Sequence, residues 1–219
     1  DRRDVYDSIA TRYDADIAMD ELVMGLLLLR RWVVGKAEGD TLELAAGTAR
    51  NLAYYDPRHV TSLTLTDASD PMLDRARAQL VPNNALKLNT LATARGVTPT
   101  TVAIADATGL PYADGTFDTV VSTFSLCSVS DPAAAVREAM RVVRPGGGRV
   151  WMLEHGRAHY SWLNRLLDAN APRHADTWGC WFNRDIGDIV TRAVESGQTS
   201  AHVERIWRTH FGTTWIVEI

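Results

Sequence analysis

Short apolar runs alternate with amphipathic stretches along this chain of 219 residues, and this alternation restricts its fold more than any other feature. Short runs bounded by turn residues predict buried strands, and apolar positions spaced by three and four predict helices between them. Such an alternation implies right-handed crossovers and a mostly parallel sheet with helices on both faces. We therefore expect one α/β domain with a seven-stranded sheet, its strands at residues 41–44, 60–66, 100–105, 117–123, 149–154, 202–208 and 213–219.

Residues that favour helix ends mark the expected helices. Asp70-Pro71 and Asp131-Pro132 each join an N-cap residue to a proline at the first helical position, where proline loses no hydrogen bond. An apolar helix at 18–34 is expected to lie across one edge of the sheet. Further helices are expected at 52–55, 70–80, 84–95, 131–143 and 186–194.

One glycine and four polar residues lie at or just after the ends of the expected strands: Gly47, Asp67, Asp106, Ser125 and Glu154. In a parallel α/β sheet these ends lie along one edge, and ligands bind there where the strand order reverses. The sequence therefore predicts one site that draws on several separate loops.

The loop ELAAGTA after the first strand restricts the ligand. A dinucleotide loop needs three glycines for close approach to a pyrophosphate, and here only Gly47 remains, with alanine at positions 45 and 49. A phosphate-binding Gly-Lys-Ser/Thr sequence does not occur. The loop thus favours a nucleoside cofactor without phosphate, S-adenosylmethionine, over NAD.

The motifs resemble those of class I S-adenosylmethionine-dependent methyltransferases over nearly the whole chain. The resemblance implies a Rossmann-like core at 37–219 behind N-terminal lid helices at 1–36. It also implies that Asp67 holds the ribose hydroxyls and Asp106 the adenine amino group. The Arg-Pro-Gly-Gly turn before the fifth strand is a further motif that matches the family. The cofactor-binding residues that it implies are Tyr13, Glu43, Ala45, Gly47, Thr48, Asp67, Ala68, Met72, Asp106, Ala107, Thr123 and Ser125.

Two further resemblances narrow the family. The stretch VYDSIATRYD resembles the start of UbiE-type quinone methyltransferases, whose lid carries a tyrosine at the position of Tyr13. FSLCSVSD, LEHG and WGCWFNRD resemble alkyl-thiol methyltransferases of the endoplasmic reticulum and related mitochondrial membrane-associated proteins. Those relatives carry an N-terminal membrane anchor. Since the chain begins at Asp1, we expect a missing anchor and peripheral membrane association, in mitochondria or at another membrane, with the cytoplasm left open.

Glu154 and His155, at the end of the fifth strand, are the candidate catalytic residues. An imidazole with a pKa near 6.5 takes a proton from a thiol, phenol or enol; alternatively, His155 only fixes the loop that follows. The expected acceptor pocket lies between the 18–34 helix and residues 156–183. Its expected walls are Met24, Leu27, Leu28, Trp162, Leu166, Trp178 and Trp181, which suit a small lipophilic acceptor.

The remaining features exclude other classes. A net charge of −4 offers no basic stripe to a nucleic acid. Cys127 and Cys180 match no zinc spacing, and the pair His155 and His159 lacks a third ligand, so we expect no metal site and assign both cysteines, unlinked, to packing. A non-catalytic, cofactor-binding subunit of a mitochondrial assembly and a phospholipid or amine N-methyltransferase remain alternatives, as do monomer and homodimer.

Overall fold

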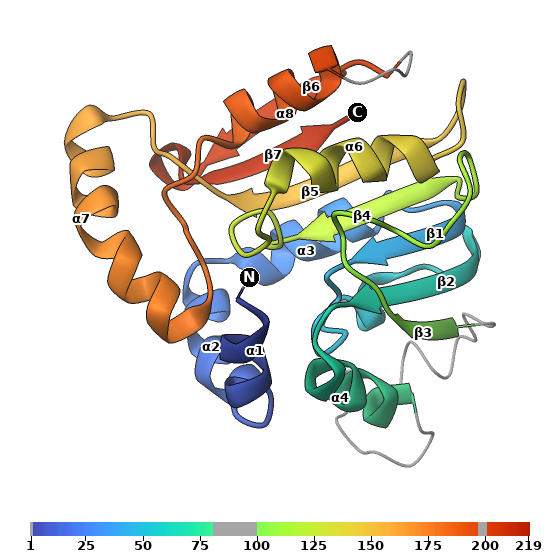
Figure 1. Cartoon of the computed structure of the whole chain (residues 1–219), viewed down its shortest axis with the longest axis horizontal. Coiled ribbons are helices and arrows are strands. Elements are labelled where there is room, and N and C mark those ends of the chain that lie inside the picture. Colours follow the sequence, from blue (N-terminus) through green and yellow to red (C-terminus); the bar gives the residue numbers. More distant parts are fainter. Residues whose placement is uncertain (1, 81–99, 197–200) are drawn as a thin grey trace.

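Seven strands form one sheet in the computed structural model, which describes residues 2–80, 100–196 and 201–219 (Figure 1). The strand order is β3-β2-β1-β4-β5-β7-β6. Strands β1 to β5 run parallel, and β7 lies antiparallel between β5 and β6. The strands are β1 Gly39–Leu44, β2 Val60–Asp67, β3 Thr100–Ile104, β4 Thr119–Thr123, β5 Arg149–His155, β6 Arg205–Thr209 and β7 Thr214–Glu218. The predicted mostly parallel, seven-stranded α/β sheet is confirmed.

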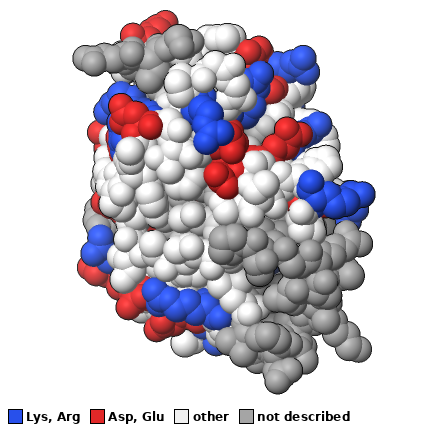
Figure 2. Space-filling model, turned by 90° about the vertical axis from the view of Figure 1, so that its right-hand side faces the viewer, with Lys and Arg blue, Asp and Glu red and all other residues white. Residues whose placement is uncertain are grey.

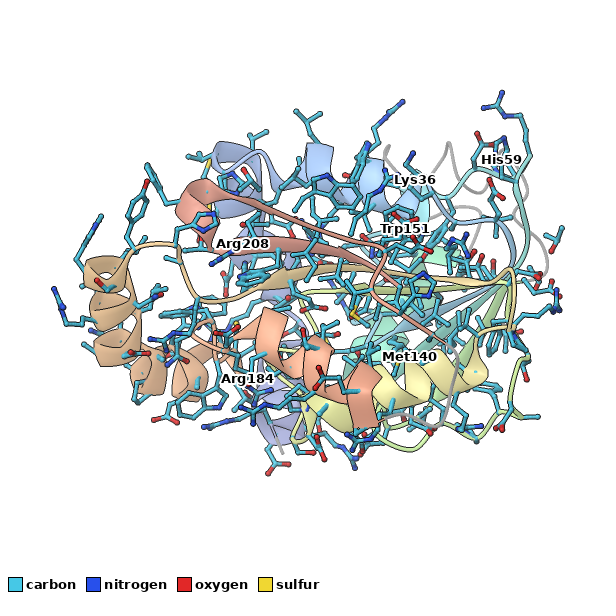
Figure 3. All side chains as sticks on the ribbon, turned by 90° about the horizontal axis from the view of Figure 1, so that it is seen from above. Lys36, His59, Met140, Trp151, Arg184 and Arg208 are labelled. Carbon is cyan, nitrogen blue, oxygen red and sulfur yellow. The ribbon has the colours of Figure 1, made fainter. Side chains whose placement is uncertain are left out.

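Helices cover both faces of the sheet. Helices α6 and α8 lie on one face, and α3 and α4 lie on the other (Figure 1). Met140 of α6 and Trp151 of β5 lie on these opposite faces of the sheet (Figure 3). The helices are α1 Arg3–Ile9, α2 Tyr13–Val23, α3 Leu26–Val34, α4 Asp70–Leu80, α6 Pro132–Val142, α7 Ser161–Trp178 and α8 Ile186–Ser196, with 3-10 turns η1 Leu52–Tyr54 and η2 His210–Gly212.

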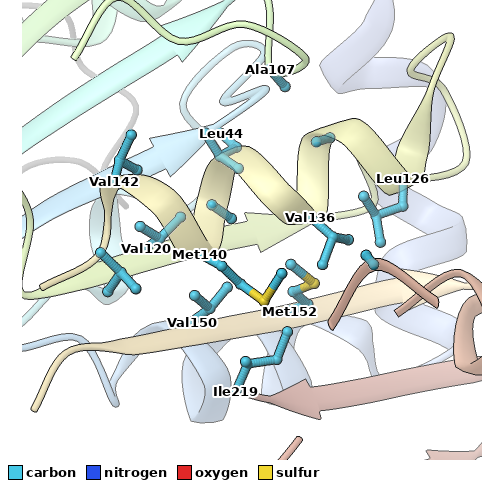
Figure 4. Close-up of a cluster of buried hydrophobic side chains, with 14 of the residues drawn as sticks. Leu44, Ala107, Val120, Leu126, Val136, Met140, Val142, Val150, Met152 and Ile219 are labelled. Carbon is cyan, nitrogen blue, oxygen red and sulfur yellow. The ribbon is translucent and has the colours of Figure 1, made fainter. Parts of the chain in front are cut away.

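The largest buried cluster lies between α6 and the sheet (Figure 4). Val136 and Met140 of α6 pack against Val120, Val150 and Met152 of the central strands. Burial of side chains of this size contributes about 1.5–3 kcal/mol each, so this layer holds the strand ends in place. The predicted cap is also present: the Asp131 side chain accepts the Ala134 N–H at 2.9 Å.

The strand order reverses beside β1. The chain passes from β1 outward to β2 and β3, then returns to β4 and β5 on the other side of β1. The loops that leave the carboxyl ends of β1 and β4 therefore diverge, and they leave a crevice between them. Every predicted cofactor residue except Tyr13 lies in the last residues of β1, β2 or β4 or in the segment that follows β1, β2, β3 or β4.

Several helix predictions need correction. The helix expected at 18–34 is two helices, because the chain breaks at Gly25, whose φ of 66° lies in the left-handed region that glycine adopts freely. The segment at 52–55 forms only the short η1. Ser69, rather than Asp70, caps α4, since its Oγ accepts the Met72 N–H at 3.3 Å.

Two other outcomes concern positions along the chain. Helix α7 is an addition, as no helix was expected between 161 and 178. The helix expected at 84–95 lies outside the described residues. Within the described ranges, no helix has the length and apolar character needed to cross a membrane.

Candidate active site

A cleft opens at the carboxyl ends of β1, β2 and β4 and encloses about 940 Å³, counting the space open to solvent. Helices α1 and α2 border it on the other side. All twelve residues predicted to bind the cofactor line this cleft: Tyr13, Glu43, Ala45, Gly47, Thr48, Asp67, Ala68, Met72, Asp106, Ala107, Thr123 and Ser125. The fold thus brings the whole predicted set together, while contact of each residue with a cofactor stays a prediction.

The loop after β1 keeps a glycine-like backbone although it contains one glycine. Ala45, Gly47 and Ala49 have φ angles of 47°, 55° and 64°, all in the left-handed region. An L-residue there costs about 1–2 kcal/mol. The two alanines therefore preserve the tight turn, at some cost in stability.

Three backbone N–H groups of this loop already donate hydrogen bonds within the protein. The Ala46 N–H donates to the Thr66 carbonyl, the Gly47 N–H to Asp67 Oδ2 (2.8 Å) and the Ala49 N–H to the Ala46 carbonyl. A phosphate-binding loop needs such N–H groups free and pointing at its ligand. The loop therefore fits a cofactor without phosphate, as the glycine pattern predicts.

Asp67 fastens this loop to the end of β2. Its Oδ2 accepts the Gly47 N–H, and its Oδ1 accepts the Ser69 N–H at 2.8 Å. Burial raises the pKa of the Asp67 carboxyl, and the N–H donors partly oppose that rise. Each carboxylate oxygen accepts more than one hydrogen bond, so Asp67 retains acceptor capacity for a ribose diol.

Asp106 is exposed at the end of β3. Its Oδ1 accepts the Thr108 N–H (2.8 Å) and the Thr108 hydroxyl (2.7 Å). These two bonds fix the side chain at the rim of the cleft, where the resemblance places the adenine.

Ion pairs join α2 to the β1 loop at the border of the cleft, and the sequence did not reveal them. Asp14 accepts the Thr48 hydroxyl at 2.7 Å and pairs with Arg50 at 3.0 Å. Glu21 also pairs with Arg50, and Arg50 Nε donates to Glu21 Oε2 at 3.1 Å. The spacing of seven residues puts both carboxylates on one face of α2, which is the signal that could have found them.

A buried polar network lies beneath these ion pairs. Arg30 donates to Glu21 (2.7 Å), Asn51 (3.0 Å) and Thr123 (2.8 Å). Asn51 also donates to Glu43, which accepts the Tyr55 hydroxyl at 2.7 Å. Burial raises the pKa of Glu43 to about 7. Glu43 and Thr123 therefore position the loop and β4 as well as lining the cleft.

A second cavity, the acceptor cavity, adjoins the cleft and encloses about 1140 Å³, again with solvent-open space. The two share Tyr6, Tyr13, Arg30 and Phe124. Phe124 has a φ of 56°, and its ring centroid lies 4.3 Å from that of His155. These four side chains line both spaces, so the cleft and the acceptor cavity adjoin along them; we call the four side chains the common wall.

The two predicted catalytic residues are separated. His155 lines the acceptor cavity. Glu154 lines neither space: it is fully buried and accepts the Ser122 hydroxyl (2.6 Å) and the Leu126 N–H (2.9 Å). Successive side chains of a strand project to opposite faces, so β5 directs the two apart. Burial raises the pKa of Glu154 to about 8, and we assign it to fixing the loop after β4.

The predicted acceptor walls are correct in part. Met24 and Trp178 line the cavity, whereas Leu27, Leu28, Trp162, Leu166 and Trp181 do not. Leu28 and Trp162 are exposed on the surface because the break at Gly25 and the helical turn of α7 direct them outward. The walls that the sequence missed include Tyr6, Phe124, Cys127, Leu167, His174, Cys180 and Phe182. Both cysteines are free, as predicted, but they line the cavity.

Charged side chains of both signs are visible on the face turned away from α7 (Figure 2). On this face, positive and negative side chains of the described residues lie near one another.

Comparison with known sequences gives consistent relatives. A family described as "Methyltransferase domain" matches residues 42–150. "Methyltransferase OMS1, mitochondrial" of Saccharomyces cerevisiae is 32% identical over 223 residues, which cover 99% of this chain and 45% of that protein. The "Ubiquinone/menaquinone biosynthesis C-methyltransferase UbiE" of Idiomarina loihiensis is 31% identical over 173 residues, covering 75% of this chain and 63% of that protein. The chain thus spans between 45% and 63% of the length of these relatives.

Solved structures share the fold. A S-adenosylmethionine-dependent methyltransferase of Thermotoga maritima aligns with a TM-score of 0.62 and 18% identity, over 98% of this chain and 97% of that one. Another from Mesorhizobium loti aligns with a TM-score of 0.60 and 17% identity, over 87% of this chain and 94% of that one. At such identities the likeness shows the common architecture.

Proposed function

Since this chain belongs to the UbiE-like class I S-adenosylmethionine-dependent methyltransferases, we propose that it transfers a methyl group to a small lipophilic acceptor: a thiol, phenol or quinol. The observation that carries the proposal is the common wall of Tyr6, Tyr13, Arg30 and Phe124 between a polar cleft and an apolar cavity. Because these side chains line both spaces, a donor in the cleft and an acceptor in the cavity would lie next to one another at the boundary, which is the proximity that methyl transfer needs.

The residues of the cleft fit S-adenosylmethionine. Asp67 would accept hydrogen bonds from the ribose hydroxyls, and Asp106 would meet the adenine amino group. When bound, this cofactor supplies a methyl group that is already activated by positive charge, so the protein contributes mainly proximity, orientation and exclusion of water.

The links between α2 and the β1 loop support the exclusion of water. Asp14 of α2 binds Thr48 and Arg50, and Glu21 of α2 binds Arg50. Tyr13 of the same helix lines both spaces. A lid that is fastened to the β1 loop would keep the cofactor oriented while the acceptor reacts.

On the acceptor side, His155 is the proposed proton acceptor, since its imidazole lines the cavity. The walls include Leu26, Phe124, Leu167 and Phe182. Asp20, Glu21 and Arg30 also line the cavity, but Glu21 and Arg30 pair with each other. The apolar part of the wall suits a lipophilic acceptor, because a highly charged one would lose its hydration there without compensation. The names of the UbiE relatives support a quinol precursor as one acceptor to test.

We also propose that the protein associates with a lipid surface. Exposed apolar side chains gather on the helices that border the acceptor cavity: Met19, Leu22 and Val23 of α2, Leu28 of α3, and Trp162 and Leu166 of α7. A lipophilic acceptor would reach the cavity directly from the bilayer.

The lipid association is tested by sedimentation with phosphatidylcholine vesicles. The wild-type protein should cosediment with the vesicles, and a Leu28→Asp/Trp162→Asp double variant should not. Equal sedimentation of the two proteins would contradict the proposal.

The function is tested with methyl-labelled S-adenosylmethionine and a panel of alkyl thiols, quinol precursors, small phenols and phospholipid amines. We expect label in a thiol, phenol or quinol. Label in an amine would favour the N-methyltransferase alternative. Tight cofactor binding with no turnover on any acceptor would favour a non-catalytic subunit.

A further inference from the structure

Three potential metal ligands from distant parts of the chain converge in the acceptor cavity. Cys127 lies in the turn after β4, His155 ends β5, and Cys180 follows α7. Their sulfur and nitrogen ligand atoms all lie within 4.8 Å of one another, and Cys180 Sγ is 3.6 Å from His155 Nδ1. Both cysteines are buried, and all three residues line the cavity.

The surrounding structure holds each of the three in place. The Trp181 N–H donates to the Cys127 carbonyl at 2.8 Å, which joins the two cysteine-bearing segments. His174 Nδ1 donates to the Cys180 carbonyl at 2.9 Å, and Gly179, with a φ of 71°, turns the chain from α7 into Cys180. The His155 ring packs on Phe124. The cluster is therefore positioned before any ligand binds.

The arrangement matches a known coordination chemistry. In a tetrahedral zinc centre with Zn–S near 2.3 Å and Zn–N near 2.1 Å, neighbouring ligand atoms lie about 3.6 Å apart. The Cys180–His155 separation already has this value, and the other pairs need shifts of only about 1 Å. Two thiolates and an imidazole select zinc over magnesium or calcium, which prefer oxygen.

We propose that Cys127, His155 and Cys180 bind one zinc ion, whose fourth coordination position faces the acceptor cavity. Binding converts two thiols into thiolates and releases two protons to solvent, so the centre Zn²⁺(S⁻)₂ carries no net charge beside the neutral imidazole. Three protein ligands with one open position is the pattern of catalytic rather than structural zinc sites.

Sequence spacing conceals such a site. The ligands are separated by 28 and 25 residues, unlike the close pairs of zinc fingers, so the expectation of no metal site followed from local spacing alone. Simple packing explains a buried cysteine on its own. It gives no reason for two thiols and an imidazole to meet at the wall of an apolar cavity.

The open position has a consequence that rests on the proposed function. An acceptor thiol or phenol that displaces water from zinc gives up its proton to solvent and is held as a nucleophile beside the common wall. Methylation converts a thiolate to a neutral thioether, a weaker ligand that leaves the metal. In this arrangement His155 acts as a zinc ligand instead of the proton acceptor of the metal-free site, and the bound zinc lowers the pKa of the acceptor.

The test is metal binding by the full chain, fully reduced and stripped of metal, in the absence of cofactor and acceptor. Zinc affinity is measured by competition with a chromophoric chelator, and cobalt substitution reports the ligands. We expect one ion per chain, with intense visible bands of a tetrahedral cobalt site and a sulfur-to-cobalt charge-transfer band. Cys127→Ser, Cys180→Ser and His155→Gln should each weaken zinc binding at least about 100-fold.

The control is His59→Ala, which removes an exposed histidine far from the cavity (Figure 3) and should leave zinc affinity unchanged. Circular dichroism and the melting shift with S-adenosylmethionine show whether each variant folds; Cys127→Ala and Cys180→Ala serve if a serine variant does not. Less than one zinc per reduced chain, or equal affinity in wild type and the cysteine variants, overturns the site. Unchanged turnover of zinc-free enzyme overturns the role in activation and leaves the proposed methyl transfer standing.

Discussion

Asp14 of α2, part of the proposed N-terminal lid, accepts a hydrogen bond of 2.7 Å from the hydroxyl of Thr48, which joins α2 to the loop that follows β1. Arg50 adds a second link from the same loop to the same carboxylate. The lid is thus attached to the part of the sheet that would hold the cofactor, and its attachment should influence cofactor binding directly.

We predict that Asp14→Ala lowers the affinity for S-adenosylmethionine roughly fivefold to tenfold, because the open lid no longer encloses the ligand. Isothermal titration calorimetry measures the effect. Asp16→Ala is the control, since Asp16 pairs only with Arg12 on the surface of the described structure. Equal losses in both variants would show that α2 acts through general helix stability instead.

We predict that Ala45→Gly stabilises the fold by about 0.5–1 kcal/mol. Relief of the left-handed strain, worth about 1–2 kcal/mol, exceeds the entropy that glycine adds to the unfolded chain. Ala49→Gly should change stability little, because its methyl is buried and the loss of that burial costs about 0.8 kcal/mol. Urea unfolding compares the two, and a destabilised Ala45→Gly would contradict the strain.

We predict that Asp67→Ala weakens cofactor binding by about 1.5–3 kcal/mol, the contribution of charged hydrogen bonds, and leaves the domain folded. S-adenosylmethionine at 100 times its dissociation constant should raise the free energy of unfolding of the wild-type protein by about 2.7 kcal/mol, which is seen as a raised melting temperature. NAD should leave the melting temperature unchanged. Asp70→Ala, on the exposed first turn of α4, is the control. A normal cofactor affinity in Asp67→Ala would leave that residue only the role of fixing the Gly47 loop.

We predict a pH dependence of stability from Glu43. Its pKa is about 7 in the fold against an ordinary value of 4.5, because burial disfavours the charge. A raised pKa means that its stabilising contribution is complete below pH 4.5 and is lost as the pH rises through 7. Between these limits the free energy of unfolding of wild type should fall, relative to Glu43→Gln, by on the order of 3 kcal/mol. Denaturation of both proteins at pH 5 and pH 8 measures this difference. If the free energy of unfolding changes equally with pH in both proteins, a group other than Glu43 causes the pH dependence.

We predict opposite outcomes for the neighbours at the end of β5. His155→Ala should lower the maximal rate by roughly 10²–10⁴-fold with little change in cofactor affinity. Glu154→Gln should keep most of the rate, because the pKa of about 8 leaves the native carboxyl largely protonated near neutrality and an amide is close to it in shape. Near-normal turnover in His155→Ala would give the imidazole a purely structural role.

The sequence predicts the strand ends well because their signals are local. Asp67 and Asp106 each follow an apolar run, and such a run with an acidic end is visible without knowledge of the fold. Gly25 was equally visible, but its effect was missed because one glycine inside an apolar stretch is often tolerated by a helix.

Contacts between distant segments could not be read in this way. Arg30 meets Thr123, and Cys127 meets Cys180, only after β4 and α7 have been placed against the N-terminal helices. The local sequence around one residue of such a pair does not indicate which distant residue it will contact. The exposed Trp162 was wrongly assigned to the cavity for a related reason, since the direction of a side chain depends on a helix that was not predicted.

The common wall has a kinetic meaning. Tyr13 belongs to the lid and borders both spaces, so a lid movement that releases spent cofactor also disturbs the acceptor side. On the proposed function, donor and acceptor would then not exchange independently: the donor would enter first and leave last, and the methylated product would leave through the acceptor cavity while the lid is shut. Steady-state kinetics should therefore follow an ordered sequence, with lid opening after each turnover setting the upper limit of the rate.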